Sequence, residues 1–118
     1  MQVERLDFVT IPTRDAERSR AFYRDVLGLP SDPNNAAEIA TPNVTLAFWN
    51  PEDDGLEFSP NMGGIALRVA DVAASRAELE AKGIDFEGTV DSGVCHMAFC
   101  TDPDGNYVIL HRRYKPYE

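Results

Sequence analysis

The sequence predicts an α+β fold made of two βαβββ modules. Three observations support this: an alternating strand pattern precedes each of two helix patterns, short strand patterns follow each helix, and the two halves repeat one another. The chain has 118 residues, which suits one domain and allows roughly two thirds of its surface to be buried on folding. Its 43% hydrophobic and 26% charged residues are typical of a globular protein.

Asp15 and Gly28 mark the two ends of the first helix. Aspartate is a good N-cap, and glycine is favoured just after a helix because it readily adopts left-handed backbone angles. Between them Phe22, Val26 and Leu27 recur at helical spacing. The elements expected in this half are a strand at 6–12, this helix, a turn-rich loop at 31–35, short strands at 37–40 and 44–49, and a connector at 50–64.

The second half contains the same signals in the same order. Ile65 and Leu67 alternate as in a strand, Asp71 is an N-cap, and Gly83 ends the helix that follows. The turn Asp-Pro-Asp-Gly-Asn at 102–106 is typical of a hairpin. The elements expected here are a strand at 65–69, a helix at 71–82, and strands at 85–89, 94–101 and 107–112.

The two halves superpose along the sequence at an offset of 56 residues, which slips to 55 within the helix. The corresponding pairs are Val9 and Ile65, Ile11 and Leu67, Asp15 and Asp71, and, after the slip, Gly28 and Gly83. We therefore expect module one at about 5–50, a connector at about 51–63 and module two at about 64–114. Because each module is too small to bury its own sheet face, we expect one domain with a shared core.

The charge balance excludes several classes of partner. Twenty acidic residues against 11 basic ones give a formal charge of −9, and the basic cluster of Arg112, Arg113 and Lys115 is too short for a nucleic-acid site. No apolar run approaches the roughly 20 residues of a membrane span, and residues 1–5 do not resemble a signal peptide. We expect a cytoplasmic protein that binds neither nucleic acid nor membrane.

Cys95 and Cys100 are interpreted as small hydrophobic residues of one strand. Their spacing of five places them on opposite faces of that strand, which is too far apart for a disulfide. A structural zinc site needs about four Cys or His ligands, and the whole chain has two of each. No basic residue adjoins either thiol, so neither is expected to be a nucleophile.

Two motifs make the sequence similar to the vicinal oxygen chelate superfamily, which includes glyoxalase I, the bleomycin-resistance proteins and the extradiol dioxygenases. One is the helix Arg-Ser-Arg-Ala-Phe-Tyr-Arg-Asp-Val-Leu-Gly-Leu at 18–29, and the other is the turn at 102–106 that leads into the last strand. The resemblance covers nearly the whole chain. It implies two βαβββ modules whose sheets form an open cup, and it implies a homodimer.

Enzymes of this superfamily usually hold a divalent metal in the cup with His, Gln and Glu from the first and last strands of each module. By the resemblance, those four positions fall on Phe8, Thr45, Gly64 and Ile109. None of the four offers a carboxylate or an imidazole, so we expect no metal and no cofactor at the usual place.

Strand alternation indicates which side chains face into the cup instead. Val9 and Ile11 should pack against a helix, so their neighbours on the strand should face inward. The residues expected to bind a ligand there are Phe8, Thr45, Trp49, Arg68, Met97, Phe99, Tyr107, Ile109 and His111. Such a pocket is aromatic and apolar with one cation and one imidazole, which suits an organic molecule.

Several of these residues have a second, purely structural interpretation. His111 is the best candidate for a general base, a substrate contact or a lone metal ligand, or else it is an ordinary strand histidine. Trp49 is a stacking platform, or a core or dimer contact. Arg68 binds a ligand carboxylate, or pairs with a resident acid such as Glu38. Strand alternation places His96 on the opposite face from His111, so a metal site shared by the two is disfavoured.

Other acidic residues have simpler interpretations. Asp102 and Asp104 lie in a Pro-Gly turn, where their side chains are expected to accept bonds from backbone amides rather than act as a catalytic pair. The acidic run Glu52-Asp53-Asp54 in the connector is expected to be a solvated surface that also attracts a cationic ligand, in the same sense as the net charge.

Three functions remain open at this stage. The leading hypothesis is metal-independent binding or sequestration of a small organic, cationic molecule, as in the bleomycin-resistance branch. The alternative is a lyase, isomerase or dioxygenase with relocated metal ligands, or one with metal-free acid–base chemistry in which His111 is the base and Arg68 the anion clamp. A regulatory or scaffolding domain with a self-filled cup is the third.

Overall fold

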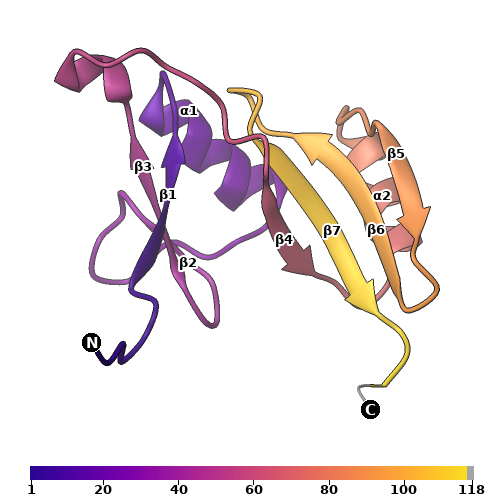
Figure 1. The fold of residues 1–118 in the computed structure, drawn as a ribbon. Helices are drawn as coiled ribbons and strands as arrows, with labels where there is room; N and C mark the ends of the chain where they lie inside the picture. Colours follow the sequence, from indigo (N-terminus) through magenta and orange to yellow (C-terminus); the bar gives the residue numbers. More distant parts are fainter. Residues whose placement is uncertain (117–118) are drawn as a thin grey trace. The chain divides into compact units, whose positions relative to one another are not determined.

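The computed structural model describes residues 1–116. The chain divides into two compact units, one from Met1 to Asn61 and one that begins at Met62, and each is described by itself. Both units contain helices and a mixed sheet, so the predicted α+β class is confirmed (Figure 1).

The first unit has a three-stranded sheet in the order β1-β3-β2 (Figure 1). β1 and β3 are parallel, and β2 and β3 are antiparallel. An isolated antiparallel bridge from Ser31 to Ile39 extends the sheet by one residue beyond β2. The elements of this unit are β1 (Phe8–Pro12), α1 (Ala16–Ala21), the π-helical η1 (Phe22–Val26), β2 (Ile39–Ala40), β3 (Thr45–Trp49) and the 3₁₀ helix η2 (Pro51–Asp54).

The second unit has a four-stranded sheet in the order β4-β7-β6-β5. β4 and β7 are parallel, while β6 is antiparallel to both of its neighbours. The same connectivity occurs in the first unit, where Ser31 occupies the place that β5 has here. The elements of this unit are β4 (Ile65–Arg68), α2 (Val72–Ala81), β5 (Gly88–Asp91), β6 (Cys95–Thr101) and β7 (Tyr107–Arg113).

The predicted N-cap residues cap the helices of both units. The Asp15 carboxylate accepts a 3.1 Å hydrogen bond from the Arg18 amide, and the Asp71 carboxylate accepts a 2.9 Å bond from the Ala74 amide. Each bond satisfies an N–H group that the first helical turn leaves without a backbone partner. Gly83 ends the second helix with a positive φ of 92°.

The first helix differs from the single α-helix that the sequence predicts. Its second half, η1, is a π-helix, in which the Leu27 amide bonds the Phe22 carbonyl at 3.0 Å. A π turn accommodates one residue more than an α turn. The one-residue slip between the repeats, from an offset of 56 to 55, falls in this segment. The structure therefore absorbs the extra residue of module one as a π turn.

Two predicted strand boundaries were also wrong. The strand predicted at 85–89 lies at Gly88–Asp91, because the Ile84 amide is still bonded to Leu79 at the end of α2. The strand predicted at 37–40 is only Ile39–Ala40, because Asp32 and Asn35 hold the preceding residues in turns. The connector contains η2, which Asn50 caps by accepting a bond from the Glu52 amide.

Each unit buries apolar side chains between its sheet and its helix. In the first unit, the Tyr23 ring is fully buried and lies 5.3 Å from the Phe22 ring and 5.6 Å from the Phe48 ring. The buried core of the first unit also includes Ile11, Ile39 and Leu46, and that of the second consists of Val72, Leu79, Ala98, Cys100, Val108 and Leu110. Within residues 1–116, no helix is long and apolar enough to cross a membrane.

Candidate functional site

One face of the first sheet packs against the helix of its unit, and we call the opposite face the helix-free face. Phe8, Thr45 and Trp49 lie on this helix-free face. Phe8 pairs with Thr45, and Pro12 pairs with Trp49, so these side chains share one face. Leu46, which alternates with them on β3, is buried on the other face. Phe8 is 57% exposed and Trp49 is 39% exposed, which is high for large apolar side chains. The predicted alternation is thus confirmed in this unit.

Trp49 is anchored to the acidic run that follows it. Its indole Nε1 donates a 2.6 Å hydrogen bond to Oδ2 of Asp54 in η2. In the same region the Arg14 guanidinium lies 4.4 Å from the centre of the Phe58 ring and 3.7 Å from the Glu52 carboxylate. The indole is therefore held in place by its polar edge while part of the ring stays exposed.

The helix-free face of the second sheet, defined by seven residues, brings together six of the predicted site residues. β7 supplies three of them, and the register places Met97 opposite His111 and Phe99 opposite Ile109. β4 adds Ala66 opposite Ile109 and Arg68 opposite His111. The face consists of Ala66, Arg68, Met97, Phe99, Tyr107, Ile109 and His111.

Polar groups lie at two ends of this apolar face. At one end, Arg68 and His111 are neighbours on parallel strands, and in the described part of the chain neither side chain forms an ion pair or hydrogen bond. At the other end, the Tyr107 hydroxyl donates a 2.8 Å bond to Oε2 of Glu87. That bond and the Glu87 charge raise the pKa of Tyr107, so the phenol is neutral at pH 7.

The four positions at which metal ligands are usual do not fit a metal. They carry Phe8, Thr45, Gly64 and Ile109, which together offer one hydroxyl and no charged or imidazole donor. Gly64 has a φ of 78°, and a Cβ at this position would lie 2.9 Å from the Cβ of Tyr107. Within residues 1–116, no group of three His, Cys, Asp or Glu side chains is arranged to hold a metal ion.

Other sequence interpretations are also settled by contacts. Asp102 accepts bonds from the amides of Asp104 and Asn106, each at 2.9 Å, and its role as a turn acceptor is confirmed. Cys100 is buried on the helix side of β6, where burial, followed by the charges of Asp102 and Glu87, raises its pKa to about 11. This thiol is therefore not a nucleophile.

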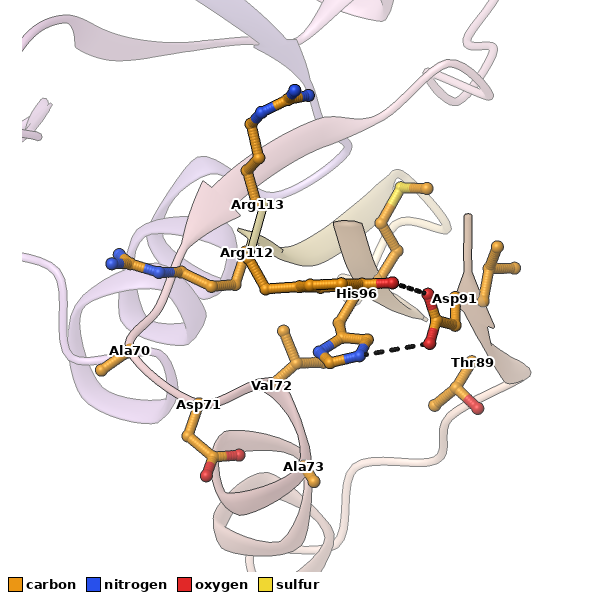
Figure 2. A pocket seen from close by; sticks show the side chains of 12 residues that line it. Ala70, Asp71, Val72, Ala73, Thr89, Asp91, His96, Arg112 and Arg113 are labelled. Carbon is orange, nitrogen blue, oxygen red and sulfur yellow. Dashed lines mark hydrogen bonds and ion pairs between the residues drawn. The ribbon is translucent and has the colours of Figure 1, made fainter. Parts of the chain in front are cut away.

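Sequence reasoning missed a hollow that lies at the start of α2 and involves His96. It has a volume of about 630 Å³, and its lining comes from the segment 70–73, from β5 and β6, and from the residues that end and follow β7 (Figure 2). His96 pairs with Arg112 in the sheet and not with His111, as predicted. The signal that could have found it is the short Asp91-Ser92-Gly93 turn, which places Asp91 opposite His96.

The His96 ring is held between two partners in this hollow. Its Nε2 lies 3.4 Å from Oδ2 of Asp91, and its ring centre lies 4.5 Å from that of Tyr114. The Tyr114 hydroxyl donates a 2.7 Å bond to Oδ1 of the same Asp91 (Figure 2). That bond, and then the bond from the Gly93 amide, lower the pKa of Asp91, which is ionised at pH 7.

The family model of the Glyoxalase/Bleomycin resistance protein/Dioxygenase superfamily matches residues 5–110 of the sequence. The chain belongs to this superfamily. Its βαβββ connectivity and its helix-free sheet faces agree with that membership. The resemblance inferred from the helix at 18–29 and the turn at 102–106 is thereby confirmed.

Solved structures with the same fold include proteins of different described functions. An antibiotic-binding protein, TnmS3 from Streptomyces sp. CB03234, is 24% identical, with a TM-score of 0.76 and coverage of 96% of this chain and 98% of that one. A superfamily member from Sphaerobacter thermophilus is 22% identical (TM-score 0.78; coverage 92% and 97%). A lactoylglutathione lyase from Agrobacterium tumefaciens is 19% identical (TM-score 0.75; coverage 93% and 94%). No curated protein matches the sequence.

Proposed function

We propose that the protein binds a small organic molecule on the helix-free faces of its sheets without using a metal ion. The observation that carries this proposal is the face of the second sheet, where Met97, Phe99 and Ile109 form an apolar surface beside Arg68 and His111. Apolar and aromatic side chains bind the body of an organic ligand, and a few polar groups fix its orientation.

The residues at the usual ligand positions support binding over metal-dependent catalysis. Phe8 and Thr45 are partners on the first sheet, and Ile109 is a partner of Ala66 on the second, so these positions present methyl, phenyl and hydroxyl groups. On the first sheet, Phe8 and Trp49 are two exposed rings that can stack on a planar ligand. The fold is also that of an antibiotic-binding protein, TnmS3.

The negative net charge of the protein attracts cations at long range, which supports a cationic ligand over an anionic one. A formal charge of −9 raises the local concentration of cations, and Glu52, Asp53 and Asp54 lie next to Trp49. We further propose a homodimer located in the cytoplasm, as predicted from the resemblance and from the sequence. Sedimentation at several protein concentrations tests the dimer.

Calorimetric titration with cationic glycopeptides and with planar natural products tests the proposed function. We expect heat of binding and a change in the emission of Trp49, the only tryptophan. Binding should weaken in Phe99→Ala and, for probes that also carry a carboxylate, in Arg68→Ala. It should be unchanged in Lys82→Ala, which removes a charge beyond the end of α2. Arg68 is exposed, so its loss leaves the core intact. Absence of binding across both ligand sets would contradict the proposal.

A specific observation favours one alternative, an enzyme that uses His111. The imidazole lies beside Arg68 and opposite Met97 and has no protein partner in the described residues, so it is available as a general base. Metal analysis of protein purified without chelators separates the two functions. Stoichiometric Ni, Zn, Fe or Mn that is lost in His111→Ala would replace the binding proposal with this one.

A further inference from the structure

We propose that the hollow beside His96 is a second binding site, which shares Met97 with the helix-free face, and that it takes an organic anion carrying a carboxylate or phosphate group. We call it the His96 pocket and define it by Ala70, Val72, Asp91, His96, Arg112 and Tyr114 (Figure 2). At about 630 Å³ its volume falls in the range of small-molecule sites. Its central histidine faces the helix side of the sheet.

Basic side chains are concentrated in this region. A second hollow of about 360 Å³ adjoins the His96 pocket, since the two share Arg112, Arg113 and Tyr114. Its lining adds Arg68 and Lys115, so four of the chain's 11 basic residues line these two hollows. In a protein of net charge −9, such clustering opposes the overall charge pattern and favours an anionic ligand.

Arg112 is the cation that we assign to bind that anion. Its side chain is exposed, and among residues 1–116 it forms no ion pair or side-chain hydrogen bond. In Figure 2 Arg112 and Arg113 leave the strand in different directions, as neighbouring strand residues do, and both guanidinium groups lie away from Asp91. A guanidinium binds a carboxylate or a phosphate through two parallel hydrogen bonds.

The two carboxylates of the pocket are already used within the protein. Asp71 accepts the Ala74 amide as the N-cap of α2. Asp91 accepts bonds from the Tyr114 hydroxyl and the Gly93 amide and pairs with His96. Because Asp91 lies at Nε2, the other imidazole nitrogen, Nδ1, is left for a ligand.

The remaining lining suits an organic body attached to the anion. Val72 and Ala73 supply apolar surface at the first turn of α2. Tyr114 covers His96 at a ring distance of 4.5 Å and has its hydroxyl fixed, so its ring is a rigid wall. The pocket thus combines one free guanidinium, one imidazole and an apolar floor.

Nuclear magnetic resonance titration of the full chain with phenyl phosphate, benzoate, inorganic phosphate and benzyl alcohol tests this site. We expect phenyl phosphate or benzoate to shift the amide signals of residues 70–73 and 96, with benzyl alcohol giving no such shifts. Comparing the first two probes shows which anionic group the site prefers, and inorganic phosphate shows whether the organic body contributes. Added salt should weaken the interaction, because charge carries part of it.

Two variants and a control locate the binding. We expect Arg112→Gln and His96→Gln each to lower the affinity for the more tightly bound probe about tenfold. This is the effect of losing one charge-assisted hydrogen bond. Lys82→Gln removes the same charge at the far end of α2 and should leave binding unchanged. Equal binding in all three variants, equal shifts with benzyl alcohol, or shifts confined to residues 66, 99 and 109 would overturn the proposal. Phe99→Ala should weaken binding at the helix-free face and leave the His96 pocket intact. A failure of this proposal can therefore be distinguished from a failure of the proposed function.

Discussion

Tyr114 donates a 2.7 Å hydrogen bond from its hydroxyl to Oδ1 of Asp91 and thereby ties the segment after β7 to the end of β5. The two residues are 23 positions apart in the sequence. Backbone bonds support the same junction, since the Tyr114 amide donates a 2.9 Å bond to the Val94 carbonyl in the β5–β6 turn. His96 completes the arrangement, with its Nε2 lying 3.4 Å from Oδ2 of Asp91.

The first prediction concerns the pKa of Asp91. The Tyr114 bond is the largest cause of its lowered pKa, so Tyr114→Phe should raise that pKa toward the ordinary value. A lowered carboxyl pKa stabilises the fold above the unfolded-state pKa, and this contribution is lost as the pH falls through the folded-state value. Carbon-13 titration of the Asp91 carboxyl carbon measures the change. The control is Tyr107→Phe, which removes a hydrogen bond to Glu87 instead and should leave the titration curve of Asp91 unchanged.

The second prediction concerns the turn at 102–106, which leads into β7. Asp102 is 5% exposed and accepts bonds from two backbone amides and from Nδ2 of Asn106, which is 2% exposed. Asp102→Ala leaves these buried donors without their acceptor and should lower the free energy of unfolding by about 2–4 kcal/mol. Urea denaturation measures this change in the free energy of unfolding. Asp102→Asn keeps one acceptor oxygen and should cost less, so equal losses in the two variants would be inconsistent with this account.

The third prediction concerns Cys100. Because its pKa is raised to about 11, the thiol is neutral in the folded state and should not react with iodoacetamide at pH 8 until urea is added. A raised cysteine pKa stabilises the fold below the unfolded-state pKa of about 8.5, and this stabilisation is lost as the pH rises toward about 11. The stability of Cys100→Ala should therefore fall less steeply over that range. Alkylation of Cys100 in the folded protein would count against the buried assignment.

The fourth prediction separates backbone strain from steric contact at Gly64. Gly64→Ala should destabilise by about 2 kcal/mol or more, because alanine disfavours a positive φ and the added Cβ meets Tyr107 at 2.9 Å. Gly28→Ala is the matched control, since Gly28 has a φ of 77° and no atom within 4 Å of its added Cβ. Thermal unfolding should show the larger loss for Gly64→Ala. The same contact predicts that Gly64→His does not restore a metal ligand.

Much of the fold was predictable because its signals are local. The caps at Asp15 and Asp71 form bonds within three residues, and the turn at 102–106 closes on itself, so neither depends on distant parts of the chain. Alternation along β1, β3, β6 and β7 also predicted which side chains share a face, since each strand has only two faces. The absence of metal-ligating residues at four positions followed from the sequence together with the resemblance.

The sequence by itself determined the α+β class, the internal repeat, the helix caps and the composition of the helix-free faces. Only the tertiary structure decided that the extra residue of module one becomes a π turn, and that Asp91, His96 and Tyr114 meet around one pocket. The reason is physical: caps and alternation depend on neighbours along the chain, whereas this pocket depends on strand register and on where the chain runs after β7. A histidine that alternation alone assigned to the helix side thus lines the second proposed site.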